Sequence, residues 1–299
     1  GTTSGDVSLV ATTGDLTLAG TTVSAGHLAA TAAGALVQSG SMNAASASLA
    51  STGDLTISGD TSATGALALD AGHDLHNTGS VRAGGAIDVH AAGDLDNGGS
   101  IAAEGGGAVR VDGALVQTAD GKLQSNGDLS VTAGRVGNSG TLASTKNLAL
   151  KAQGDLALSG TTQAGGALTI DTAGDVQNAG SLLASSALSI TANRIGNTGT
   201  IATDGAFDLH ARTALDNQGS FYTGQAFNIA ADTFTLGAAA SLSSAQDITI
   251  DVTGAPVVLS DLTISDDGTV VTFLRGGEPN TRGWVANPTS DPNGQERAV

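Results

Sequence analysis

Three side chains that could bind a metal ion or transfer protons lie close together in the stretch GHDLHNTGSVRAGGAIDVHAA, residues 72–92. They are His73, Asp74 and His76. Imidazole and carboxylate groups at this spacing are used for divalent-metal binding and for general acid–base catalysis. Which chemistry they could do depends on what the rest of the chain places beside them.

An aspartate recurs directly before the first apolar residue of a repeated unit, as Asp15, Asp54, Asp74, Asp94, Asp155 and Asp175. Carboxylates stacked about 4.8 Å apart could hold a cation. They could equally close turns by accepting hydrogen bonds from local amides, and we favour this second interpretation. Arg135 and Arg194, one repeat from Asp155 and Asp175, would then neutralise part of the column. The Gly-Gly-x-Gly-x-Asp signature of calcium-binding β-rolls is missing, so we expect no metal and no cofactor.

The histidines and the remaining carboxylates give little support for catalysis. The histidines are His27, His73, His76, His90 and His210. His76 lies one repeat below Asp96, which predicts a contact between them, but surface decoration explains the set better than catalysis. Carbohydrate-active enzymes also use β-helices, with carboxylates clustered on one face. Here the carboxylates are spread over repeated corners and aromatic residues make up only 2% of the chain, so we expect no enzyme.

The elements that must position these groups are copies of one unit of about 20 residues. The first apolar residues of the units are Leu16, Leu36, Leu55, Leu75, Leu95, Leu115, Val136, Leu156, Val176, Ile195, Leu215 and Phe234. Apolar residues return six, twelve and fourteen positions later, and the last two share the strand period. The pattern predicts an all-β fold, a right-handed parallel β-helix of about twelve coils with three short strands per coil and a length on the order of 60 Å.

The corners between the strands carry Gly, Asn, Asp and Ser, which accept positive φ or close turns with their side chains. Six asparagines share one corner position, and we expect them to stack as a structural ladder. They are Asn77, Asn97, Asn138, Asn178, Asn197 and Asn217. Leu18, Ile57 and Leu158 replace them in other units.

The repeat predicts a shaft over residues 1–250, final strands or a cap over 251–275, and a mobile tail or linker over 276–299. The unit from Leu95 to Ala114 departs from the pattern, because its final apolar pair shifts to Val109 and Val111, and a local bulge or loop is expected there.

Composition narrows the possible partners. The net charge of −17 disfavours nucleic acid and anionic membranes. No apolar run approaches the ~20 residues of a membrane span, so no membrane insertion is expected. The chain has no cysteine, and its stability must come from stacking. If the shaft itself binds a receptor, the exposed aromatic residues for that contact are expected to be Tyr222 and Trp284.

The sequence resembles the repeats of filamentous haemagglutinins and of contact-dependent inhibition exoproteins. Three segments carry the resemblance: GHDLHNTGSVRAGGAIDVHAAGDLDNGGSIAAEG, GRVGNSGTLASTKNLALKAQGDLALSG and NRIGNTGTIATDGAFDLHARTALDNQGSFYTG. Their shared form is Leu-x-Asn-x-Gly-[Ser/Thr]-Ile-x-Ala followed by an apolar pair. The resemblance implies a two-partner secretion substrate, exported through an outer-membrane transporter of a Gram-negative bacterium and then secreted or displayed on the cell surface.

Together these observations predict a structural shaft that holds a binding or effector module of an adhesin or toxin carrier away from the cell. The receptor is unknown. Two alternatives remain open: a carbohydrate-active β-helical enzyme, and a shaft that is itself the adhesive surface.

Overall fold

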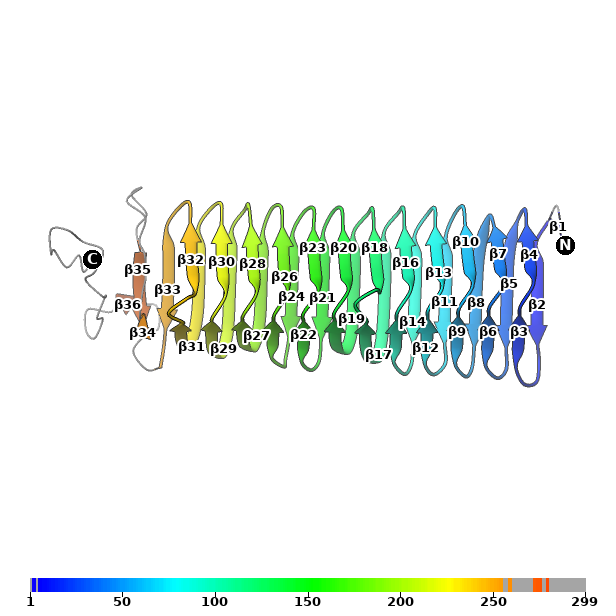
Figure 1. Ribbon diagram of the computed structural model, residues 1–299, viewed down its shortest axis with the longest axis horizontal. Coiled ribbons are helices and arrows are strands. Elements are labelled where there is room, and N and C mark those ends of the chain that lie inside the picture. The colour runs from blue at the N-terminus through cyan, green and yellow to red at the C-terminus, as the bar shows by residue number, and fades with distance from the viewer. Residues whose placement is uncertain (1, 4, 255–257, 260–270, 276–277, 280–299) are drawn as a thin grey trace.

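The computed structural model describes residues 2–3, 5–254, 258–259, 271–275 and 278–279. In this part of the chain, parallel strands stack into one solenoid whose coils follow each other along the long axis (Figure 1). The described residues form no helix, and therefore none with the length and hydropathy needed to cross a membrane. The predicted all-β parallel β-helix is confirmed.

One face of the solenoid is a 13-stranded parallel sheet of short strands, one per coil. In spatial order the strands are β1 (Thr2–Thr3), β4 (Thr21–Ser24), β7 (Ser41–Ala44), β10 (Asp60–Ala63), β13 (Ser80–Ala83), β16 (Ser100–Ala103), β18 (Lys122–Ser125), β20 (Thr141–Ser144), β23 (Thr161–Ala164), β26 (Ser181–Ala184), β28 (Thr200–Thr203), β30 (Ser220–Thr223) and β32 (Ser241–Ser244).

The second sheet supplies the other two strands of each coil. In some coils these two strands are separated by a corner, and the first of them is the longer. The first strands are β2 (Val7–Ala11), β5 (His27–Ala32), β8 (Ser46–Ser51), β11 (Leu67–Ala71), β14 (Ile87–Ala91), β21 (Leu148–Ala152), β24 (Leu168–Thr172) and β33 (Ile248–Val252). The short strands that follow are β3 (Leu16–Leu18), β6 (Leu36–Gln38), β9 (Leu55–Ile57), β12 (Leu75–Asn77), β15 (Leu95–Asn97), β22 (Leu156–Leu158) and β25 (Val176–Asn178).

In five coils the two strands of this sheet are continuous. These long strands are β17 (Gly107–Gln117), β19 (Leu129–Asn138), β27 (Leu188–Asn197), β29 (Phe207–Asn217) and β31 (Phe227–Leu236). Three further strands follow the regular repeat: β34 (Val258–Leu259), β35 (Val271–Arg275) and β36 (Glu278–Pro279). β35 pairs in parallel with β33 and antiparallel with β36. The boundaries expected at residues 250 and 275, and the tail 276–299, stay predictions, because much of this region lies outside the described residues.

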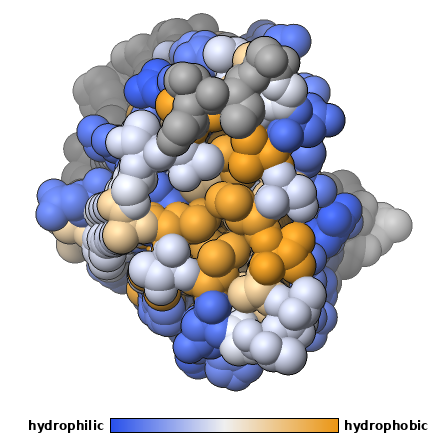
Figure 2. Space-filling model, turned by 90° about the vertical axis from the view of Figure 1, so that its right-hand side faces the viewer, coloured by the Kyte–Doolittle hydropathy of each residue, from blue (hydrophilic) through white to orange (hydrophobic). Residues whose placement is uncertain are grey.

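The register of the coils follows the predicted apolar positions. Each first apolar residue, from Leu16 to Phe234, pairs directly with its equivalent in the next coil. The inward residues form one continuous core cluster from Leu28 to Val252. Figure 2 looks onto the N-terminal end and shows apolar atoms in the centre with polar residues around the rim. Each coil therefore closes the core of its neighbour, as expected for a solenoid.

Glycine is required at one corner for space rather than for backbone conformation. Among the described residues only Gly14 has a positive φ, of 79°, so positive φ, one of the two roles expected of the corner residues, is found there alone. Four residues after the first apolar residue, a Cβ would lie far closer than 3.0 Å to the carbonyl oxygen of the glycine one coil earlier, as Gly79 lies against Gly59 and Gly99 against Gly79. Glycine permits this close backbone approach.

The irregular unit keeps its register. Val109 and Val111 form the buried apolar pair, as predicted, and they pair with Val89 and Ala91 without a change of register. Gly107 takes an apolar position, and a Cβ there would meet Leu129 Cδ1 at 2.8 Å and Ile87 Cγ2 at 3.3 Å. The side chains above and below therefore fill the space. The expected bulge is present, because the register with the following coil shifts between Val111 and Ala114.

Candidate functional site

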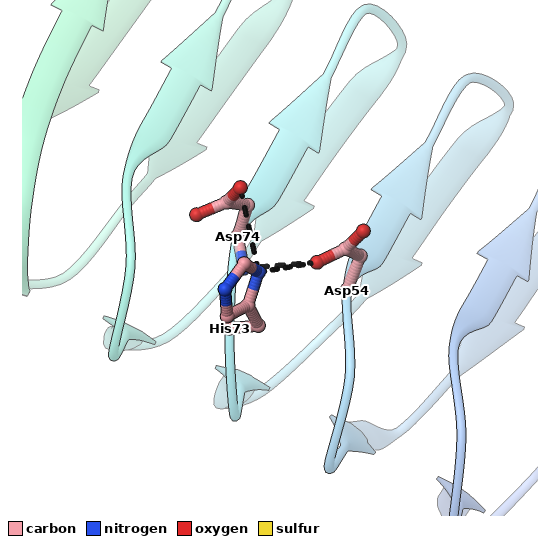
Figure 3. Close-up of side chains that lie close together, drawn as sticks. All are labelled: Asp54, His73 and Asp74. Atoms are coloured by element: carbon pink, nitrogen blue, oxygen red, sulfur yellow. Dashed lines mark hydrogen bonds and ion pairs between the residues drawn. The ribbon is translucent and has the colours of Figure 1, made fainter.

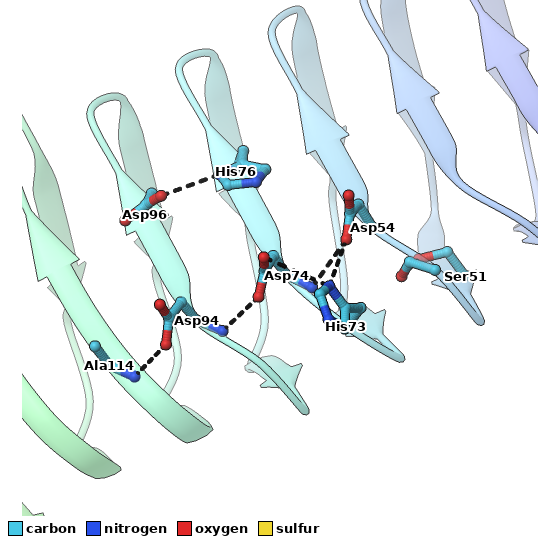
Figure 4. A network of polar contacts seen from close by, with 9 residues as sticks. Ser51, Asp54, His73, Asp74, His76, Asp94, Asp96 and Ala114 are labelled. Carbon is cyan, nitrogen blue, oxygen red and sulfur yellow. Dashed lines mark hydrogen bonds and ion pairs between the residues drawn. The ribbon is translucent and has the colours of Figure 1, made fainter.

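The corner aspartates form a ladder that links neighbouring coils. Asp74 Oδ1 accepts a hydrogen bond from the backbone N–H of Asp94 at 2.8 Å, and Asp94 Oδ1 accepts one from Ala114 N–H at 2.7 Å (Figure 4). Asp15 and Asp155 bond in the same way to amides one coil later, at 2.8 and 2.9 Å. The carboxylates satisfy corner amides, as expected, but these amides belong to the next coil and not to the same turn.

This ladder explains why glycine stands beside the carboxylate in the coil that follows several of the aspartates. A Cβ on Gly93 or Gly113 would collide with the Oδ1 of the aspartate one coil earlier, Asp74 or Asp94 respectively. His73 occupies the equivalent position before Asp74, so a side chain stands there where its neighbours have none. The Asp74 N–H then lies 3.2 Å from Asp54 Oδ1, a longer hydrogen bond than those in the next two coils.

His73 lies between two carboxylates from adjacent coils (Figure 3). Its Nδ1 is 2.9 Å from Asp54 Oδ1 and 3.5 Å from Asp74 Oδ2. The hydrogen bond to Asp54 and the negative charges of Asp74 and Asp54 raise the pKa of His73 above its usual value. Hydrogen bonds from the Asp74 amide and from the His73 side chain lower the pKa of Asp54. Within the described coils, these three residues are the group whose donor atoms come close enough to hold one metal ion.

Two further histidines pair with aspartates across a coil boundary. His76 Nδ1 lies 3.2 Å from Asp96 Oδ2, which confirms the contact predicted from the repeat. His90 Nδ1 lies 2.8 Å from Asp70 Oδ1. Sequence reasoning missed the pairs His73–Asp54 and His90–Asp70, although offsets of 19 and 20 residues, one coil each, could have revealed them.

The predicted neutralisation by arginine is wrong. Arg135 and Arg194 directly precede Val136 and Ile195. These two residues pair with Leu156 and Val176, which directly follow Asp155 and Asp175. Within the described residues, however, neither arginine forms an ion pair with these carboxylates, and the ion pairs found involve histidine. Arg135, Arg194 and Asp155 are exposed, where an ion pair gains little against the entropy of holding two side chains. Asp175 instead accepts a hydrogen bond from Asn193 Nδ2 at 2.8 Å.

The six corner asparagines lie in two buried ladders. In the first, Asn77 Nδ2 donates to Asn97 Oδ1, Asn97 to Gln117 Oε1, and Gln117 to Asn138 Oδ1, over 2.8, 3.1 and 3.2 Å. Asn138 ends it by donating to Thr162 Oγ1 at 3.1 Å. Gln117 and Thr162 were not expected in the ladder.

The second ladder runs from Asn178 to Asn197 and on to Asn217, over 2.7 and 2.8 Å. Asn217 ends it by donating to the backbone oxygen of Ser241 at 3.1 Å. All six asparagines are at most 2% exposed, so a ligand in solution does not reach them.

Of the two aromatic residues expected to contact a receptor, the structure describes Tyr222. Tyr222 points outward and is 46% exposed, whereas its neighbour Phe221 is buried. Phe221 packs edge-on against Phe207 and Phe227, which stack on each other with ring centroids 4.4 Å apart. Trp284 lies outside the described residues. A receptor-binding role for Tyr222 or Trp284 stays a prediction.

A hollow on the outer surface crosses β8, β11, β14 and β17. It is lined mainly by alanine, serine and glycine, with Asp88 and Asp128 among its carboxylates. No Phe, Tyr or Trp is among its lining residues, which are the rings on which sugars usually stack.

The comparison with protein-family models matches the chain to the haemagglutinin repeat in four segments, residues 2–59, 62–124, 105–180 and 179–271. The chain belongs to the haemagglutinin repeat family. The comparisons with curated proteins and with solved structures give no match. This family is of the structural, adhesin type, its repeats occur in two-partner secretion substrates, and it indicates a secreted or surface-exposed bacterial protein. The solenoid and the repeats together fit an adhesin-like extended shaft.

Proposed function

We propose that this chain is the shaft of a secreted or surface-displayed adhesin or contact-dependent toxin carrier of a Gram-negative bacterium. Its task is mechanical: it holds a binding or effector module away from the producing cell. An outer-membrane transporter of the two-partner secretion type is the export partner implied by the haemagglutinin repeats. The receptor and the carried module stay open.

The observation that carries the proposal is the unbroken register from Leu16 to Phe234, with one core that runs the length of the solenoid. Each coil is held by the same ladder bonds and apolar contacts as its neighbours, so length can change by whole coils while the local packing stays the same. A rod of this kind transmits force and sets a distance without chemistry of its own.

The experiment changes shaft length within the protein that carries this chain. Whole coils are removed or added, and the secreted amount and thermal midpoint are measured as controls. We expect adhesion or effector delivery to vary with coil number while folding and secretion stay constant. Delivery that is independent of coil number would contradict the proposal.

The same set of variants separates the alternatives. Exchange of outward side chains such as Tyr222→Ser leaves shaft length unchanged, so loss of adhesion in those variants alone would identify the shaft as the adhesive surface. Release of reducing or unsaturated ends from acidic polysaccharides by the purified chain would instead identify an enzyme.

A further inference from the structure

We propose that Asp54, His73 and Asp74 bind one divalent transition-metal ion, with Zn²⁺ as the probe, and that the ion links two adjacent coils. The proposed site lies outside the core, on the corner-aspartate ladder to which Asp54 and Asp74 belong, and the proposal does not depend on the shaft role.

The spacing of the donor atoms fits a single ion. His73 Nδ1 lies 2.9 Å from Asp54 Oδ1 and 3.5 Å from Asp74 Oδ2, and the three donor atoms lie within 4.8 Å of one another. Ligands bound at about 2.1 Å in tetrahedral or octahedral geometry are separated by about 3.0–3.4 Å. The two measured separations bracket this range, so small side-chain movements would seat the ion.

The donor set selects the class of metal. One imidazole nitrogen and two carboxylate oxygens suit Zn²⁺ and its neighbours, whereas Ca²⁺ takes oxygen ligands. The His73 side chain is 68% exposed and the Asp54 side chain 49%, so water completes the coordination sphere. The ion takes the place of the proton that His73 Nδ1 shares with Asp54.

The repeat itself sets this position apart. The equivalent residues in the next two coils are Gly93 and Gly113, because the preceding carboxylate occupies the space of a Cβ. At His73 the chain accepts a side chain there, and the amide bond to Asp54 lengthens to 3.2 Å. Asn193 also replaces glycine at the equivalent corner and donates to Asp175 Oδ1. Among the described corners, His73 differs from it by adding a metal-binding donor to two carboxylates, as expected of a functional position.

The coils provide a matched control. Asp74 and Asp94 form the same carboxylate pair one coil later, but Gly93 stands between them in place of histidine. If carboxylates alone bound the ion, that corner would bind it as well. The His73→Gly variant converts the candidate site into this control geometry and restores the residue that the repeat uses.

The test is calorimetric titration of the chelator-treated whole chain with ZnCl₂ near neutral pH, with the thermal midpoint measured in parallel. We expect one Zn²⁺ per chain, a higher midpoint with Zn²⁺ because the ion binds only the folded coils, and at least about tenfold weaker binding in His73→Gly and Asp74→Asn. His73→Gly introduces the residue that the repeat uses at this corner and is expected to fold without metal, so its loss of binding reports on the site.

His76→Gln and His90→Gln remove the two-donor pairs with Asp96 and Asp70, and both should bind Zn²⁺ as the parent does. The proposal is overturned if the parent shows neither heat nor a midpoint shift, if His73→Gly binds Zn²⁺ unchanged, or if Ca²⁺ binds equally well in the presence and absence of His73.

Discussion

Asn77 donates a hydrogen bond from its side-chain Nδ2 to Oδ1 of Asn97, 2.8 Å away in the next coil, and both amides are fully buried. Every amide in the two ladders points the same way, so the first member of each has a carbonyl that faces an aliphatic residue. Asn77 Oδ1 and Asn178 Oδ1 are buried without a hydrogen-bond partner, and their neighbours in register are Ile57 and Leu158.

Because Asn178 Oδ1 lacks a partner beside Leu158, Leu158→Asn should lower the free energy of unfolding less than other polar substitutions in the core. An amide at 158 would accept from Asn138 and donate to Asn178 Oδ1, which joins the two ladders, and each bond contributes about 1 kcal/mol. Leu156→Asn is the matched control, because Leu156 is equally buried but has only apolar neighbours in register. Denaturant unfolding should show Leu158→Asn less destabilising than Leu156→Asn by about 2 kcal/mol. Equal losses would mean that the ladders are not extended by the new amide.

The adjacent residues Phe221 and Tyr222 should differ sharply in their effect on stability. Phe221→Ala removes a ring that contacts Phe207 and Phe227 and should cost about 3–5 kcal/mol. Tyr222→Ala removes an outward ring and should change the free energy of unfolding by no more than about 0.5 kcal/mol. Chemical denaturation of both variants checks the contrast, and a large loss for Tyr222→Ala would place that ring in a contact absent from this structure.

Removal of a whole coil should leave the fold intact. Deletion of residues 75–94 joins Asp74 to Leu95, which then takes the register position of Leu75 against Leu55. We expect cooperative unfolding, an unchanged β-sheet circular dichroism spectrum and a rod shorter by about 4.8 Å in solution scattering. Deletion of residues 75–84 removes half a coil and sets the corners of one coil against the strands of the next, so it should abolish cooperative unfolding. Similar behaviour of the two deletions would contradict the register.

The His73–Asp54 pair should make stability depend on pH in the metal-free protein. The pKa of His73 is raised from 6.5, so its contribution is complete below pH 6.5 and is lost as the pH rises through the higher folded value. The pKa of Asp54 is lowered from 3.8, so its contribution is present above pH 3.8 and is lost as the pH falls through the lower folded value.

The stability advantage of the parent over His73→Gln should therefore be greatest between about pH 3.8 and 6.5. Titration of the histidine ring protons by NMR in the presence of chelator measures the His73 pKa directly. A value at or below 6.5 would contradict the contact with Asp54.

The sequence was sufficient to predict the coils because the solenoid constrains side chains at a fixed period. Leu75 must meet Leu55 and Leu95, and any residue too polar or too large at that position would disturb two neighbours at once. The contacts at the corners were harder to predict from the sequence, because they depend on which backbone groups of one coil approach the next. Gly79 reads as a turn residue in sequence, whereas in space it makes room for a carbonyl of Gly59.

The candidate metal site shows the same limit. Within residues 72–92 the visible neighbours of His73 are Asp74 and His76, but His76 turns to Asp96 and the decisive partner is Asp54 in the preceding coil. A search of the repeat for the one corner with His in place of Gly would have found the exception. The distance from His73 to Asp54 could not be obtained without the fold.

A chain of near-identical units faces a problem of degeneracy, since any coil could in principle stack on a wrong copy during folding. The amide ladders are interrupted at Ile57 and Leu158, and glycine stands at the apolar position 107. These departures from the repeat make individual coils different from one another. A coil that skipped a neighbour would leave Ile87 and Leu129 without the gap at Gly107 that they fill. The departures from the repeat thus favour the observed stacking of the coils over stacking on a wrong copy.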